Sequence, residues 1–406
     1  MSSTKASQSV FTHLECAHCG KTHAKELPNT VCTDEACKAI LYARYDFSAN
    51  VPTKQDLKHR PPSLWRYREF LPVVDDKNIV TLGEGFTPVL PVTNLTAHTD
   101  GKRVLIKDES GNPTGSFKAR GLCMAISKAK ELGLSAFVIP TAGNAGGALS
   151  AYAAKAGLEA HVFMPKLTPR AFKAEAALFG AEVIEVDGNI SDCGKLANKL
   201  AAENGWFDVS TLKEPYRLEG KKTMGYEIAE QLDWNVPDVI LYPTGGGTGI
   251  IGIWKAFGEL QQLGWIGSKR PRMVAVQSKS CDGIYTAFHR KEIRSTYKDE
   301  GFTIANGLRV PKPYADGVIL QVLRESNGNS VSVGDADILS ALRELADGEG
   351  LFVAPEGAAL WHAYKELNRS GWIKDGETVL LLNTGSGYKY IDNILDAAPR
   401  PDSADG

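Results

Sequence analysis

Short apolar runs alternate with helix-length stretches along most of this chain, and this alternation constrains its fold more than any other feature. The runs at 103–107, 136–140 and 239–242 are rich in aliphatic residues, and each precedes a longer stretch with the length of a helix. Strands this apolar, separated by helices, are typical of a parallel sheet that helices cover on both faces. The sequence therefore predicts an α/β protein, with further strands at 272–276 and 379–382.

Length and local composition divide the chain into several units. At about 150 residues per domain, the 406 residues correspond to two or three units. Residues 279–315 interrupt the alternation with charges and turns, as expected of an insertion. The predicted units are a Cys-rich segment at 1–48, a larger domain from 49–120 and 236–398, a smaller domain at 121–235, and a tail at 399–406.

Charge and hydropathy exclude two classes of partner. Lys and Arg number 46 and Asp and Glu number 48, so the formal charge is −2 and no large field attracts a polyanion. No apolar run reaches the roughly 18 residues that span a bilayer, and the first ten residues lack the apolar stretch of a secretory signal. We therefore expect no nucleic-acid partner, no membrane association and a cytoplasmic location.

Three glycine-rich loops follow apolar runs, at 141–147, 244–249 and 383–387. Ligands of open α/β sheets bind beyond the carboxyl ends of strands, so we expect a binding site at these loops. The second loop would turn free N–H groups and the dipole of the next helix toward one anion, such as a phosphate. Its sequence is neither a Walker A loop nor a dinucleotide fingerprint. The alternative is a tight turn in which glycine only relieves crowding.

Lys118 lies near the start of a predicted helix at 117–132, for which Ser116 is the expected N-cap. The helix dipole opposes a cation in the first turn, so the pKa of Lys118 should fall. A lysine with a lowered pKa can form a Schiff base, although a lone lysine is more often a solvated surface residue. A reactive lysine and a phosphate cradle together are what pyridoxal phosphate requires, because this cofactor carries an aldehyde and a phosphate.

Four of the seven Cys residues lie close together near the N-terminus, as Cys16-x2-Cys19 and Cys32-x4-Cys37. This spacing is within the range of structural zinc sites, and two such pairs can close a tetrahedral site. We expect these four residues as candidate zinc ligands. The alternative is a metal-free segment that packs on the main body through apolar contacts.

Several motifs together resemble a known family. They are Pro113-Thr114-Gly115-Ser116-Phe117-Lys118-x-Arg120-Gly121, Gly143-Asn144, Gly245-Gly246-Gly247-Thr248-Gly249 and Thr384-Gly385-Ser386-Gly387. In this order they look like the fold-type II pyridoxal phosphate enzymes, and the resemblance implies two doubly wound parallel-sheet domains of the tryptophan synthase β type. Within them the chain is most similar to the threonine synthases. Gly83-Glu84-Gly85-Phe86-Thr87-Pro88 resembles their entry motif, and the Cys segment resembles their zinc-ribbon-like N-terminus.

The resemblance implies a cofactor site. Lys118 would form the covalent link to the cofactor aldehyde and later shuttle protons, with Phe117 beside it. Asn144 would hydrogen-bond the 3′-oxygen of pyridoxal, Thr384 would offer its hydroxyl to the pyridine nitrogen, and Gly245, Gly246, Gly247, Thr248 and Gly249 would hold the phosphate. By themselves, Asn144 also fits a left-handed turn between glycines, and Thr384 also fits a cap for the helix after residue 388.

The resemblance also implies a substrate site. Thr87 and the loop of Thr141, Ala142 and Gly143 would contact the substrate, whose carboxylate the N–H groups of this loop would receive. Ala142 and Ala119 depart from the family, which usually has Ser or Thr at the first position and Asp at the second. The cation that binds a substrate phosphate is not fixed by the pattern: Lys166, Arg170 and Lys173 are candidates, or they form a solvated helix face.

The implied reaction is that of threonine synthase, a carbon-oxygen lyase that converts O-phospho-L-homoserine and water to L-threonine and phosphate. One rival is a β-replacement enzyme such as cysteate synthase, which would use O-phospho-L-serine, and another is a serine/threonine dehydratase. Dehydratases usually have His-Ala-Gln after Gly-Asn, whereas Ala145-Gly146-Gly147 follows here. A rival of another class is a non-catalytic metabolite sensor, against which an intact Lys118 speaks. We expect a phosphorylated amino acid as the small-molecule partner and a homodimer as the assembly.

Overall fold

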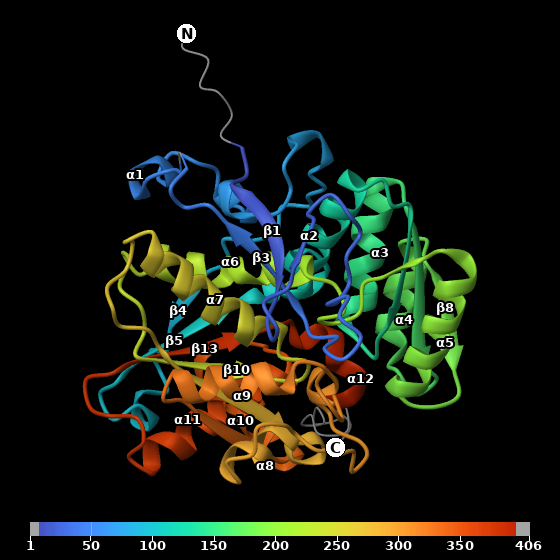
Figure 1. The fold of residues 1–406 in the computed structure, drawn as a ribbon. Helices are drawn as coiled ribbons and strands as arrows, with labels where there is room; N and C mark the ends of the chain where they lie inside the picture. Colours follow the sequence, from blue (N-terminus) through green and yellow to red (C-terminus); the bar gives the residue numbers. More distant parts are fainter. Residues whose placement is uncertain (1–7, 50, 395–406) are drawn as a thin grey trace.

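The computed structural model describes residues 8–49 and 51–394, and three β-sheets lie within them. Two sheets consist mainly or wholly of parallel strands, and the third is a small antiparallel sheet of the N-terminal segment (Figure 1). The prediction of an α/β fold with two doubly wound parallel sheets is confirmed. The predicted tail at 399–406 lies outside the described residues.

The larger sheet has six strands in the order β12-β11-β10-β13-β5-β4. Neighbouring strands pair in parallel, except β4 and β5, which are antiparallel. The chain moves outward from β10 to β12 and then returns to β13 on the other side of β10, so a ligand crevice is expected between β10 and β13. The strands are β4 Val89–Pro91, β5 Arg103–Asp108, β10 Val239–Pro243, β11 Arg272–Ser278, β12 Asn329–Val333 and β13 Thr378–Asn383.

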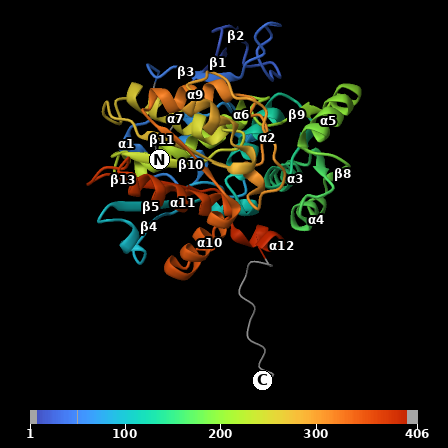
Figure 2. The same ribbon diagram turned by 90° about the horizontal axis from the view of Figure 1, so that it is seen from below.

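Helices cover both faces of the larger sheet (Figure 2). On one face, α11 packs across β10 to β13, and α10 packs on α11. On the other face, α7, α8 and α9 contact β11. Their bounds are α7 Thr248–Gln262, α8 Gly283–His289, α9 Asp316–Glu325, α10 Asp335–Glu349 and α11 Pro355–Arg369. Since α8 lies within 279–315, the expected insertion is part of the main body.

The smaller sheet has four parallel strands in the order β8-β7-β6-β9. In Figure 2, α3 and α4 lie on one side of it and α5 on the other, and α5 contacts β6, β7 and β9. The bounds are β6 Ala136–Pro140, β7 Glu159–Pro165, β8 Glu182–Val186, β9 Phe207–Asp208, α3 Asn144–Ala156, α4 Arg170–Leu178 and α5 Ile190–Asn204.

Two long helices connect the two sheets. They are α2 (Lys118–Glu131), which packs on α3 and α6, and α6 (Tyr216–Gln231), which packs on α7. Nearly all residues of both helices are buried, as expected for helices enclosed between layers. Because these helices contact elements of both sheets, the predicted domain boundaries at 120 and 235 stay predictions.

The Cys-rich segment forms an antiparallel sheet of three strands, β1 (Phe11–Cys16), β2 (Thr22–His23) and β3 (Leu41–Tyr45). It is anchored on the main body, since the Tyr45 hydroxyl donates a hydrogen bond to Glu219 Oε2 on α6 at 2.7 Å. Two short α-helices are α1 (Lys54–Leu57) and α12 (Ile391–Ile394).

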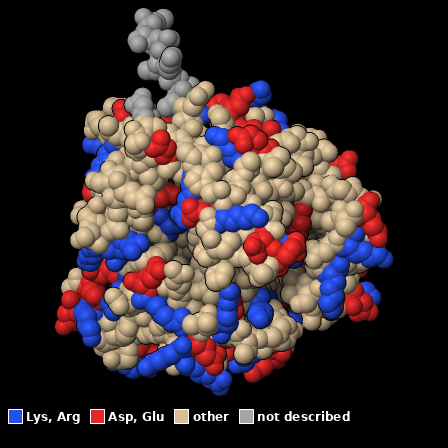
Figure 3. Space-filling view, in the orientation of Figure 1, with Lys and Arg blue, Asp and Glu red and all other residues tan. Residues whose placement is uncertain are grey.

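The surface agrees with the charge balance of the sequence. On the face shown in Figure 3, Lys and Arg side chains are interspersed with Asp and Glu. Within the described part of the chain, no helix is long and apolar enough to cross a bilayer.

Candidate active site

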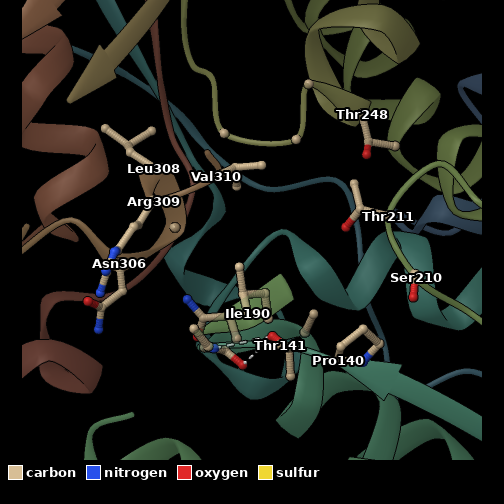
Figure 4. A pocket seen from close by; sticks show the side chains of 18 of the residues that line it. Pro140, Thr141, Ile190, Ser210, Thr211, Thr248, Asn306, Leu308, Arg309 and Val310 are labelled. Carbon is tan, nitrogen blue, oxygen red and sulfur yellow. Dashed lines mark hydrogen bonds between the residues drawn. The ribbon is translucent and has the colours of Figure 1, made fainter. Parts of the chain in front are cut away.

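The loops that follow β6, β9, β10 and β13 meet at one cavity of about 460 Å³ between the two sheets (Figure 4). The predicted loops at 141–147, 244–249 and 383–387 all contribute lining residues. Residues 306–312, from the segment that the sequence indicated as an insertion, form another wall. The structure therefore brings together the three glycine-rich loops, as predicted from their positions after strands.

Lys118 is the first residue of α2 and lines the cavity, as does Phe117. Its pKa is lowered to about 7, first by removal of the amine from solvent and then by the nearby charge of Arg217, while Glu356 acts in the opposite direction. The lowered pKa agrees with the sequence prediction, but burial rather than the helix dipole is the main cause. At neutral pH a large share of Lys118 is therefore the free, nucleophilic amine.

The predicted N-cap at Ser116 is wrong. Ser116 has extended backbone angles, Phe117 occupies the N-cap position, and the buried Ser116 hydroxyl has no hydrogen-bond partner in the described residues. The reason is a contact with a distant loop: Ser116 bridges to Gly385, and the Phe117 N–H donates to the Thr384 carbonyl at 3.0 Å. This contact holds Lys118 beside the loop after β13.

The loop after β10 forms an anion cradle. Among the described residues, the backbone N–H groups of residues 245–250 have no acceptor, and the buried Thr248 hydroxyl has no hydrogen-bond partner. Gly247 has φ +80° and precedes α7. A Cβ at Gly245 would lie 2.2 Å from the Gly307 carbonyl oxygen, so glycine also relieves crowding here. Both sequence interpretations hold, and the free donors at a helix N-terminus can bind a phosphate.

Asn144 begins α3 and is linked through hydrogen bonds to two residues that the sequence analysis missed. Its Nδ2 donates to the Tyr390 hydroxyl at 3.0 Å, and that hydroxyl donates to Glu356 Oε1 at 2.9 Å. The amide oxygen of Asn144 is buried and has no hydrogen-bond partner in the part of the chain that the structure describes. Asn144 is not among the residues with positive φ, so the alternative of a left-handed turn is wrong. The amide oxygen of Asn144 is therefore available to a ligand.

Thr384 lines the cavity at the end of β13. The alternative role as a helix cap is wrong, because Ser386 performs it: its side chain accepts from the Tyr388 N–H before the turn at Gly387–Tyr390. The structure gives no partner for the Thr384 hydroxyl, which leaves it available to a ligand in the cavity.

The predicted substrate residues separate into two groups. Thr141, Ala142 and Gly143 line the cavity, and the N–H groups of residues 142, 144 and 145 have no acceptor in the described chain. Thr87 does not line the cavity: its hydroxyl donates to Glu109 Oε1 at 2.6 Å within a buried ion network of α2 and α6. Its predicted contact with substrate has no support from this position.

None of the three candidate phosphate-binding cations lines the cavity. Lys166 pairs with Asp187 and Lys173 with Glu185 on the outside of the smaller sheet, so the alternative of a solvated face is the better description. The sequence analysis missed two cations on α6. Lys221 lines the cavity. Arg217, one turn earlier, does not line it, and two of its buried guanidinium nitrogens have no hydrogen-bond partner among the described residues.

The four N-terminal Cys residues lie together. Their sulfur atoms are all within 4.8 Å of one another, with 3.5 Å between Cys16 and Cys37 and 3.6 Å between Cys19 and Cys32. Tetrahedral zinc with bonds of about 2.3 Å requires sulfur atoms about 3.8 Å apart. The donor set and its dimensions therefore fit a structural zinc ion. The Tyr314 hydroxyl, at the cavity wall, donates to the Lys38 carbonyl beside this cluster.

The comparisons with known proteins agree with this site. Residues 80–385 match the family described as "Pyridoxal-phosphate dependent enzyme". The chain belongs to this family. Among its relatives is the threonine synthase of Methanosarcina acetivorans, 34% identical over 394 residues, which are 97% of this chain and 96% of that protein. The threonine synthase of Methanocaldococcus jannaschii is 34% identical over 95% of both chains.

Solved structures of other proteins share the fold. A threonine deaminase from T.th. superposes with a TM-score of 0.61 at 27% identity, over 74% of this chain and 92% of that chain. Maize serine racemase has a TM-score of 0.65 at 23% identity, over 77% and 93% of the two chains. The second likeness concerns the fold alone.

As a member of the pyridoxal-phosphate dependent enzymes, the chain offers matching groups for the cofactor. Three groups in the cavity have no hydrogen-bond partner among the described residues and match parts of the cofactor. They are the amine of Lys118, the N–H donors of residues 245–250, and the amide oxygen of Asn144. An aldehyde requires an amine and a phosphate requires donors. The cavity residues therefore fit pyridoxal phosphate.

Proposed function

We propose that this enzyme is a threonine synthase, a lyase that converts O-phospho-L-homoserine and water to L-threonine and phosphate. The observation that carries the proposal is the presence of two further anion sites beside the phosphate cradle. One is the set of N–H groups at residues 142, 144 and 145, which have no acceptor in the described chain. The other is Lys221, which lines the cavity, with the buried Arg217 one helical turn earlier on α6. An amino acid with a carboxylate and a phosphate needs both. Relatives 34% identical over nearly the whole chain support the same reaction.

Each residue of the site would have a separate role in this reaction. Pyridoxal phosphate, when bound, supplies an electron sink for negative charge at the substrate Cα. Lys118 Nζ would accept the Cα proton, release it, and then accept the Cβ proton, since a pKa of about 7 lets the amine exchange protons near neutrality. Protons would return to Cγ and Cα to complete the product. The N–H groups at the start of α3 would orient the carboxylate, and Thr384 would hold the pyridine nitrogen. Phosphate would leave from Cγ, and water would add at Cβ.

The experiment compares two substrates. With O-phospho-L-homoserine, we expect phosphate and threonine in equal amounts, and in deuterated water the threonine should carry label from protonation of the carbon skeleton. With O-phospho-L-serine and sulfite, a β-replacement enzyme would instead release phosphate and form cysteate. Phosphate release from phosphoserine with none from phosphohomoserine would overturn the proposal. A protein that binds phosphohomoserine without turnover would be a sensor.

Further proposals concern the binding residues and the assembly. Phe117, Lys118, Asn144, Thr384 and residues 245–249 are the proposed cofactor contacts, and Thr141, Ala142 and Gly143 are the proposed substrate contacts. We retain a homodimer as the proposed assembly, which sedimentation of the cofactor-loaded protein tests. A single species with the mass of one chain would contradict it.

A further inference from the structure

A second lysine faces the cavity beside Lys118. Lys221, on α6, is 1% exposed, and its amine lies 5.0 Å from the centre of the Phe117 ring, while the Lys118 amine lies 4.3 Å from the same ring. A Cβ at Gly121 would lie 3.1 Å from Lys221 Cε, so the glycine allows the lysine stem to lie against α2. The stem is thus confined and the amine is directed into the cavity.

Arg217 lies one helical turn before Lys221, on the same face of α6. Its Nη1 donates to the Val209 carbonyl at 2.5 Å, but Nε and Nη2 are buried and without partners. Lys221 has neither a hydrogen bond nor a carboxylate within salt-bridge distance in the described residues. The buried Glu214 is the one acid that acts on Lys221, and its oxygens already accept the N–H groups of Tyr216 and Arg217.

Buried cations without counter-charges are costly, and a lysine avoids the cost by losing its proton. Burial lowers the pKa of Lys221 well below its usual range, and the charges of Arg217 and Lys118 lower it further, while Glu214 opposes them. Without an anion, the neutral form of the Lys221 amine is therefore favoured. An anion in the cavity beside Lys221 would supply the missing charge and favour the protonated form.

We propose that Lys221 adapts this corner of the cavity to the phosphate group of the substrate, being neutral when the corner is empty and taking up a proton when a phosphate enters beside it. The proposal rests on the proposed function in assigning the phosphate to the substrate. Lys221 would thereby determine specificity. A substrate with an uncharged hydroxyl as leaving group lacks the negative charge that stabilises the protonated amine.

The test titrates inorganic phosphate into the cofactor-loaded enzyme by calorimetry, at about pH 8, in two buffers with different ionisation enthalpies. In the loaded enzyme the cradle at 245–249 is occupied by the cofactor, so the second site is measured. We expect uptake of up to about one proton per phosphate, and binding that weakens as pH rises. Unchanged heats in the two buffers would overturn the proposal.

Two variants and one control identify the group that takes up the proton. Lys221→Gln should weaken phosphate binding at least about ten-fold and abolish proton uptake, whereas Lys221→Arg should bind phosphate without proton uptake because arginine stays charged. The control is Lys213→Gln, since Lys213 also lines the cavity but its amine lies 3.9 Å from Asp208; it should behave as the wild type. Proton uptake that persists in Lys221→Gln would assign the titration to another group and refute the proposal.

The outcome separates this inference from the proposed function. If phosphate binding depends on Lys221 but the enzyme makes no threonine from phosphohomoserine, the proposed reaction is refuted and the phosphate site at Lys221 is supported. If the enzyme forms threonine but Lys221→Gln does not change phosphate binding, the phosphate site is refuted and the proposed reaction is supported.

Discussion

The Tyr390 hydroxyl donates a hydrogen bond to Glu356 Oε1 at 2.9 Å, and both side chains are almost completely buried at the wall of the cavity. The Gly307 N–H donates to the same oxygen at 2.6 Å, while Oε2 of Glu356 is buried without a partner. Burial raises the pKa of Glu356, and the nearby charge of Lys118 opposes this. The carboxyl group and the amine therefore influence each other across the cavity.

Glu356→Gln should lower the pKa of Lys118 further, because it removes the one acid that raises it. The measurement is the pH dependence of the rate at which the cofactor-free protein forms its covalent adduct with pyridoxal phosphate; the midpoint should move to lower pH. Tyr390→Phe is the control, since it removes a hydrogen bond and keeps the charge, and its midpoint should move less. A midpoint unaffected by Glu356→Gln would show that the carboxyl is neutral in this state.

In the wild type, the same rate should rise with pH up to about 7 and then level off, because the free amine is the nucleophile and its pKa is about 7. An ordinary lysine with a pKa near 10.4 would have only about 1 free amine in 2,500 at pH 7. A rate that continues to rise up to pH 10 would contradict the lowered pKa of Lys118.

Thr384→Val should weaken cofactor binding about five- to ten-fold and shift the visible absorption, because it removes the hydroxyl proposed for the pyridine nitrogen while keeping the side-chain shape. Thr384→Ser keeps the hydroxyl and should stay near the wild type in both measurements. Equal dissociation constants and spectra for the two variants would exclude the hydrogen bond.

The Cys cluster should hold about one zinc ion per chain when the protein is prepared without chelator. Because metal binding is coupled to folding of such segments, a chelator or the double variant Cys16→Ser/Cys19→Ser should lower the thermal midpoint. Chelator should have no further effect on the double variant. Absence of zinc together with an unchanged midpoint in the double variant would establish a metal-free segment.

The sequence predicted those features that follow from local patterns. Apolar runs predicted the strands, and β6 begins and ends as expected. Loops after parallel strands necessarily meet at one edge of a sheet, so the glycine-rich loops could be placed in one site. The first-turn position of Lys118 followed from the helix pattern that begins beside it.

The features that the sequence did not predict depend on contacts between distant segments. Ser116 has the residue type of an N-cap, but its bridge to Gly385 moves the helix start. Lys221 belongs to a Lys-Lys pair that looks like a solvated helix face, and only the packing of α6 against α2 buries it. Glu356 and Tyr390 carry no local motif. Such residues become recognisable only when burial leaves their polar atoms short of partners.

The central claim is that Lys118, and not the neighbouring Lys221, carries the cofactor. Its direct test is reduction of the enzyme with borohydride in the presence of pyridoxal phosphate, followed by peptide mapping of the modified lysine. We predict one stable adduct, on Lys118, which Lys118→Ala eliminates and Lys221→Gln leaves in place. An adduct on Lys221 in the wild type, or no adduct at all, would contradict the account.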